Sequence, residues 1–258
     1  MNTPRFLLVS LLSALCLSAS ALAQGAPGMG VGSVPGVDPL FLKIFSKYQG
    51  FSANTSISVV ETGRNTTTTL ESGFEFLGGK LRVDMDLSKM KSPDLPAETV
   101  MQLQAMGMAQ MIILSRPDKG LTYVVYPGLK AYAELPLTGI KPGSSEEAAG
   151  KCESTDLGQE SAGGHPCAKK KLVFTMDDGK KREMLVWLAT DMKDFPIQVQ
   201  GQEAQAFATI LFKNVKLEAP AASRLDPPSG YTLYKNVQQM MQTEMMKKMG
   251  GGMPAMPE

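Results

Sequence analysis

The sequence predicts a mainly β protein of the α+β class. We expect a large curved antiparallel sheet or open barrel wrapped around one or two helices, plus a C-terminal helix. Between residues 51 and 217, about ten short segments alternate apolar and polar side chains and are separated by turn residues. Two other segments, before and within this series, carry apolar residues at helical spacing instead. The chain has 258 residues, enough for one large β domain.

The first 23 residues have the three parts of a cleavable secretory signal peptide. Arg5 supplies the positive start, residues 6–17 form an apolar run, and Ala21-Leu22-Ala23 gives the small-x-small cleavage pattern. The apolar run is too short for a permanent membrane span, which needs roughly 20 residues. We therefore expect a periplasmic or secreted protein, cleaved near Ala23-Gln24.

The cysteines fit an exported protein. Cys16 would leave with the signal peptide, and because Leu15 precedes it, the pattern disfavours the alternative of a lipoprotein signal. Cys152 and Cys167 remain as an even pair, which predicts a disulfide bond in an oxidising compartment. A metal site formed by these cysteines and His165 is the alternative, but it offers only three ligands.

The charge balance excludes one class of partner. The chain has 26 Lys+Arg and 25 Asp+Glu, and removal of the signal peptide takes away one arginine. Because nucleic-acid binders show a basic excess, we expect no nucleic-acid partner. No second stretch is apolar enough for a transmembrane helix. No dinucleotide, phosphate-loop or Gly-x-Ser-x-Gly motif is present, so we expect no cofactor and no enzyme activity.

The N-terminal part of the mature chain changes its pattern twice. Residues 24–37 are rich in glycine and proline and predict a flexible leader. A short helix capped by Asp38 should follow, with Phe41 and Phe45 on one face. From Phe51 the period becomes two, and residues 51–88 predict an antiparallel meander with a hairpin turn at Gly78-Gly79.

Residues 93–110 interrupt the strands and predict a methionine-rich helix. Its apolar residues spread over a wide arc, so this helix should be covered on several sides, and a curved sheet wrapped around it would supply that cover. The side chains that we expect to line a ligand cavity there are Val100, Met101, Leu103, Met106 and Met108.

Further strands are expected up to residue 217. The last of them, residues 206–217, should place four apolar side chains on one face: Phe207, Leu211, Val215 and Leu217. Lys169-Lys170-Lys171 lies in another and favours a solvated strand face over an anion site. Residues 236–258 are predicted to form a methionine-rich helix and a disordered tail.

Four short motifs, in order along the chain, resemble the periplasmic lipoprotein-carrier superfamily of LolA/LolB-like proteins. They are Gly79-Lys80-Leu81-Arg82-Val83-Asp84, Tyr123-Val124-Val125-Tyr126-Pro127, Trp187-Leu188-Ala189-Thr190-Asp191 and Pro228-Ser229-Gly230-Tyr231. The turn Gly164-His165-Pro166-Cys167 is closer to an uncharacterised bacterial domain-of-unknown-function family of the same fold group. The resemblance implies a half-barrel domain over residues 38–235, and more weakly a cargo role.

These observations favour a non-enzymatic protein that binds a lipid, an acylated protein or another apolar ligand. The binding site would lie between the concave sheet and the helix at 93–110. Two alternatives remain open. One is a structural or protein-interaction module of the envelope without a cavity. The other is Cu(I) binding by the methionines of the C-terminal segment, because thioethers are soft ligands.

Overall fold

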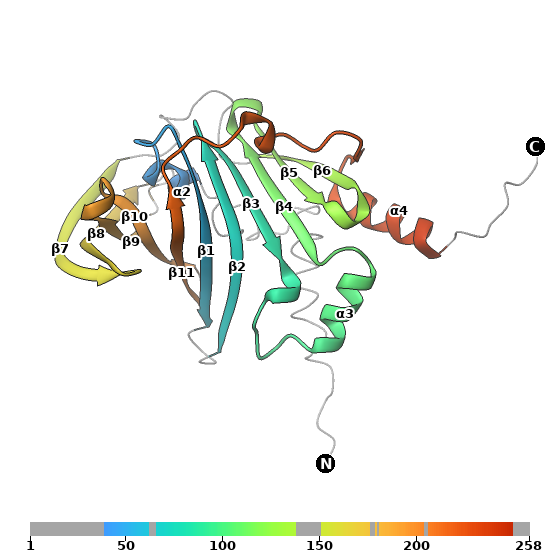
Figure 1. The fold of residues 1–258 in the computed structure, drawn as a ribbon, viewed down its shortest axis with the longest axis horizontal. Helices are drawn as coiled ribbons and strands as arrows, with labels where there is room; N and C mark the ends of the chain where they lie inside the picture. Colours follow the sequence, from blue (N-terminus) through green and yellow to red (C-terminus); the bar gives the residue numbers. More distant parts are fainter. Residues whose placement is uncertain are drawn as a thin grey trace, which may run out of the picture.

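A computed structural model of the chain confirms the predicted fold class (Figure 1). It describes residues 39–61, 66–137, 151–175, 179, 181–203 and 206–249. The described strands form one 12-stranded sheet in the order β12-β6-β5-β4-β3-β2-β1-β11-β10-β9-β8-β7. Every pairing is antiparallel except that of β12 with β6. The expected signal peptide, leader, residues 138–150 and tail lie outside the described residues.

The strands lie close to their expected positions. They are β1 (Gly50–Glu61), β2 (Thr67–Leu77), β3 (Lys80–Asp86), β4 (Gln110–Arg116), β5 (Leu121–Tyr126), β6 (Ala131–Pro136), β7 (Cys152–Ala162), β8 (His165–Thr175), β9 (Lys181–Ala189), β10 (Phe195–Glu203), β11 (Ala206–Lys216) and β12 (Thr232–Tyr234). The described α-helices are α2 (Pro39–Ile44), α3 (Ala97–Ala105) and α4 (Val237–Met249). The turn between β2 and β3 uses Gly78 and Gly79 at φ values of 54° and 80°, which favour glycine.

The sheet wraps around α2. Phe41 and Phe45 of this helix and its end are buried among phenylalanines of four strands. The rings pack mostly edge-on or tilted, with the Phe45 and Phe51 centroids 4.9 Å apart. The strand residues of this phenylalanine cluster are Phe51, Phe74, Phe76, Phe195 and Phe212. We call the sheet face that carries the cluster the inner face, and the opposite face the outer face.

The methionine-rich helix occupies a different position from the expected one. The predicted helix at 93–110 is the shorter α3, beyond the ends of β3 and β4 (Figure 1). Within α3 only Leu103 is buried. The expectation that the sheet wraps around this helix is therefore wrong. The apolar residues spread around α3 include flexible methionines, which tolerate exposure to solvent. The phenylalanines of β1 and β2 instead enclose α2.

The C-terminal segment runs along both faces of the sheet. After β11 the chain crosses the outer face through the short 3-10 helix η6 (Ala222–Leu225), then adds β12 to the edge of β6. Helix α4 packs against β6, where Val237 and Met240 join the inner core at 1% and 0% exposure. Strand β12 was not predicted from the sequence, because three residues are too few to show an alternating pattern.

Strand β11 corrects one predicted face. Ile210 and Phe212 point inward, so Phe207 and Leu211 lie on the outer side of the strand. A β-bulge between Lys213 and Lys216 then shifts the alternation, with Asn214 at a φ of 52°. The extra residue returns Val215 to the inner core. The predicted single face was wrong because a sequence pattern cannot locate a bulge.

The expected disulfide bond between Cys152 and Cys167 is absent. Both thiols are free, Cys152 exposed and Cys167 buried. They lie at opposite ends of the β7–β8 hairpin, because Cys152 pairs with Phe174 and Cys167 with Glu160. Phe174 lies seven positions after Cys167 along β8, which corresponds to roughly 23 Å. A disulfide needs Cα atoms within about 7 Å of each other.

Candidate functional site

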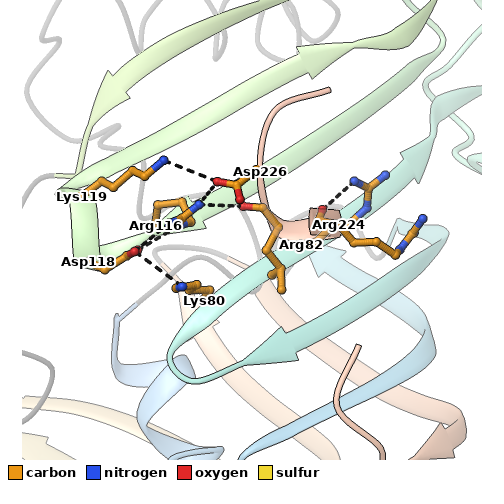
Figure 2. Close-up of polar contacts among 8 residues, drawn as sticks. Lys80, Arg82, Arg116, Asp118, Lys119, Arg224 and Asp226 are labelled. Atoms are coloured by element: carbon orange, nitrogen blue, oxygen red, sulfur yellow. Dashed lines mark hydrogen bonds and ion pairs between the residues drawn. The ribbon is translucent and has the colours of Figure 1, made fainter. Parts of the chain in front are cut away.

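A cluster of charged residues lies where the C-terminal segment crosses the outer face (Figure 2). Arg116 of β4 is only 7% exposed, and its guanidinium binds Asp118 at 2.7 Å and also Asp226. It further donates to the carbonyl oxygen of Leu225 at 3.3 Å. Hydrogen bonds from Arg116 lower the pKa of Asp118 to about 2. The Asp118 carboxylate therefore stays ionised, and it pairs with the buried Arg116 cation.

A second set of contacts fixes the same segment one turn earlier. Arg224 donates to Glu75 of β2 at 2.7 Å, and Arg82 of β3 donates to the carbonyl oxygen of Arg224 at 2.9 Å. We call residues 219–231, with these contacts, the outer strap. Because its charges are paired with each other, the cluster holds the strap on the sheet.

A shallow pocket of about 450 Å³ lies mainly on the outer face below the strap. Its carboxylates have partners: Asp84 binds Arg82 at 2.7 Å and Glu71 binds Lys213 at 3.3 Å. Within the described part of the chain, no group of three or more His, Cys, Asp or Glu residues is placed to hold a metal ion.

The lone histidine does not form a nucleophilic pair either. The Nδ1 atom of His165 lies 2.8 Å from Asp191. The Cys167 thiol points to the backbone carbonyl oxygens of Ala162 and His165, at 3.9 and 3.4 Å. Burial raises the pKa of this thiol, which disfavours the reactive thiolate. These residues fix the tip of the β7–β8 hairpin and the turn before β10.

An apolar row crosses five strands of the inner face beside the phenylalanine cluster. Its members are cross-strand partners, so their side chains lie side by side on one face. All but Leu70 are at most 6% exposed. From β2 to β9 the row consists of Leu70, Ile57, Ile210, Val199 and Val186.

The next row is apolar but less covered. Its cross-strand partners, from β1 to β8, are Val59, Ala208, Gly201, Met184 and Leu172. All five residues are partly exposed. Ala208 has a small side chain and Gly201 has none. A Cβ atom built on Gly201 would meet nothing within 4 Å. The larger neighbours on either side therefore border the open space at Gly201, and we call this second row the inner-face trough.

The cavity-lining residues predicted from the sequence lie elsewhere. Met101 is 63% exposed, Val100 and Met106 are partly exposed, and Leu103 and Met108 are buried at 6% each. Leu103 and Met108 belong to the main core, where the Met108 amide donates to the Leu103 carbonyl oxygen at 2.8 Å. None of the five residues belongs to the trough. Sequence alternation showed that each trough strand has an apolar side, but not which strands are neighbours.

The fold was compared with solved structures. Lipoprotein LppX from Mycobacterium tuberculosis is 10% identical, with a TM-score of 0.39 over 69% of this chain and 92% of that one. A LolA superfamily protein from Nitrosomonas europaea is 12% identical, with a TM-score of 0.34 over 73% of this chain and 96% of that one. The second match names the superfamily that the sequence motifs resemble. At such scores neither match bears on what this chain binds.

Comparison with curated proteins finds no match. No described helix of this protein is long and apolar enough to cross a membrane. A family model described as "Domain of unknown function (DUF4412)" matches residues 74–218, which is more than half of the chain and contains ten of the twelve strands in whole or in part. The match agrees with the unknown-function family anticipated from the turn at Gly164-His165-Pro166-Cys167. The chain belongs to the DUF4412 family.

Proposed function

We propose that this protein is an exported, non-enzymatic binding protein for an apolar ligand, held in the inner-face trough. The supporting observation is the row of five partly exposed apolar or small residues, with open space at Gly201 beside the small Ala208. A lipid acyl chain, free or attached to a protein, has the matching chemistry. The proposal moves the site expected beside residues 93–110 to β1, β11, β10, β9 and β8.

The dimensions and energetics of the trough suit a long chain. Five neighbouring strands, spaced about 4.8 Å apart, give a trough roughly 19 Å long. Each CH₂ group transferred from water to an apolar surface contributes about 0.8 kcal/mol. A long acyl chain could therefore bind firmly without any charged contact, although ordering the chain offsets part of this gain.

The proposal is tested most directly by a substitution that fills the open space at Gly201. Gly201→Leu should place a side chain in the trough and reduce uptake of a fluorescent fatty-acid probe at least tenfold, because the space for the chain is lost. Gln202→Leu is the matched control: it adds the same side chain to the next residue of β10, on the outer face, where Gln202 is exposed. Probe titration and native mass spectrometry would measure both variants against the wild type.

Two results would contradict the proposal. One is wild-type protein, purified from a periplasmic extract, that carries no lipid and takes up no probe. The other is equal probe uptake by Gly201→Leu and the wild type, with circular dichroism showing both to be folded. Either outcome would favour the structural-module alternative, in which the protein fills its core with its own side chains.

A further inference from the structure

Three consecutive lysines of β8 differ in their surroundings. Lys169 lies over the Trp187 ring, 4.6 Å from its centroid, and pairs with Glu160 at 3.2 Å. Lys171 pairs with Glu183 at 2.7 Å. Because side chains alternate along a strand, these two lie on one face of β8 and Lys170 on the other. Lys169 covers the Trp187 ring, which is 5% exposed, and each lysine of this pair has a carboxylate partner.

Lys170 continues the apolar row of Ile210, Val199 and Val186, beyond the β-bulge between Pro196 and Gln198 of β10. Its cross-strand partner on β9 is Val186, which is 1% exposed and belongs to the main core. Two residues along the same face of β8 lies Leu172, the end of the trough. Lys170 itself is only partly exposed. Its ammonium group is thus brought to one end of an apolar surface.

The carboxylate opposite Lys170 on β7 accepts a hydrogen bond within its own strand. Asp156 is the cross-strand partner of Lys170 on β7, but its Oδ1 atom accepts a hydrogen bond from the Gly158 amide at 2.7 Å. The bulge that begins at Asp156 contains Gly158 at a φ of 95°, so this local contact is built into the strand. Among the described residues, no carboxylate forms an ion pair with Lys170, in contrast to Lys169 and Lys171.

We infer that Lys170 binds the anionic head group of the ligand whose chain lies in the trough. This inference rests on the proposed function and specifies its ligand class: a long single-chain amphiphile ending in a carboxylate or a phosphate. With the head group at β8, the chain would run across β9, β10 and β11 to Val59 of β1. That path is roughly 19 Å, the length of the trough.

The test compares three ligands with the same 16-carbon chain: hexadecanoate, hexadecyl phosphate and uncharged hexadecanol. Lys170→Met keeps the aliphatic stem and removes the charge. It should weaken binding of both anions about tenfold and leave hexadecanol binding unchanged, because only the anions lose a charged partner. Lys171→Met is the control on the same strand and should alter none of the three. Isothermal titration calorimetry would give the dissociation constants.

Every other result of these titrations either supports or overturns the inference. If Lys170→Met weakens hexadecanol as much as the anions, the lysine acts through shape and the inference is overturned. An equal effect of Lys171→Met would show a nonspecific charge effect and would also overturn it. A loss for one anion only assigns the head group as carboxylate or phosphate and supports it. Failure of the wild type to bind any of the three ligands overturns the proposed function itself.

Discussion

Four buried hydroxyl groups on the inner face differ in whether they form a hydrogen bond, and this difference should affect the stability of the fold. Thr55 and Ser72, on β1 and β2, bond to each other at 2.5 Å. Ser115 and Thr122 are direct partners on β4 and β5 and are 0% exposed, yet neither hydroxyl has a partner among the described residues. An unpaired buried polar group costs about 1–3 kcal/mol.

The two pairs should respond oppositely to substitution. The double change Ser115→Ala and Thr122→Val removes two unpaired hydroxyls, so the free energy of unfolding should stay level or rise. Thr55→Val leaves the Ser72 hydroxyl unpaired and should lower it by about 1–2 kcal/mol. Urea unfolding followed by fluorescence of Trp187, the single tryptophan, would measure both. A destabilised Ser115/Thr122 variant would show that these hydroxyls have partners.

At the scale of the element, the outer strap connects two halves of the molecule. It carries the chain from β11, near the centre of the sheet order, to β12 at its edge. Leu225, 1% exposed, is the buried anchor of this crossing, and the paired charges of Arg116 and Arg224 surround it. The strap thereby brings α4 to the inner face beside β6.

Truncating the anchor should loosen the strap. Leu225→Ala is expected to lower the free energy of unfolding by about 3 kcal/mol, since it removes a buried side chain and leaves a cavity. It should also make residues 219–231 cleavable by limited proteolysis. Leu233→Ala, at a 50% exposed position of β12, is the control and should change stability by less than about 0.5 kcal/mol. Similar losses in both variants would contradict an anchoring role for Leu225.

At the scale of the whole molecule, the two cysteines report on the register of the β7–β8 hairpin. In folded mature protein, Cys152 should react with a thiol reagent. Cys167 should react only after denaturation, because it is 2% exposed and burial raises the pKa of its thiol. Cys152→Ser should abolish the reaction of the folded protein. Absence of any free thiol in denatured, unreduced monomer would instead indicate an internal disulfide and a different register.

Much of the sheet could be predicted because strand signals are local. The alternation of Leu81, Val83 and Met85 and the glycines of the adjoining turn define β3 within a few residues. The candidate site could not be predicted in the same way. Its central contact pairs Val59 of β1 with Ala208 of β11, and no local pattern states that these distant strands are neighbours.

The methionines of residues 93–110 also show that a local pattern does not reveal which distant elements pack together. Their spacing indicated an apolar helix at 93–110 but not which surface would cover it, and Met101 remains exposed. The phenylalanines of α2, β1, β2, β10 and β11 fill the inner face in its place. Large rigid rings bury more apolar area per side chain than flexible thioethers, so they determine where the core closes.

The sequence by itself determined the β-rich class, the turn positions, most strand boundaries and the presence of apolar strand faces, because these depend on neighbouring residues. Only the tertiary structure decided the strand order, the separation of Cys152 from Cys167 and the opposite directions of Lys170 and its neighbours. These features depend on register, and a shift of one residue reverses every side chain of a strand. The trough and its proposed anion contact arise from that pairing.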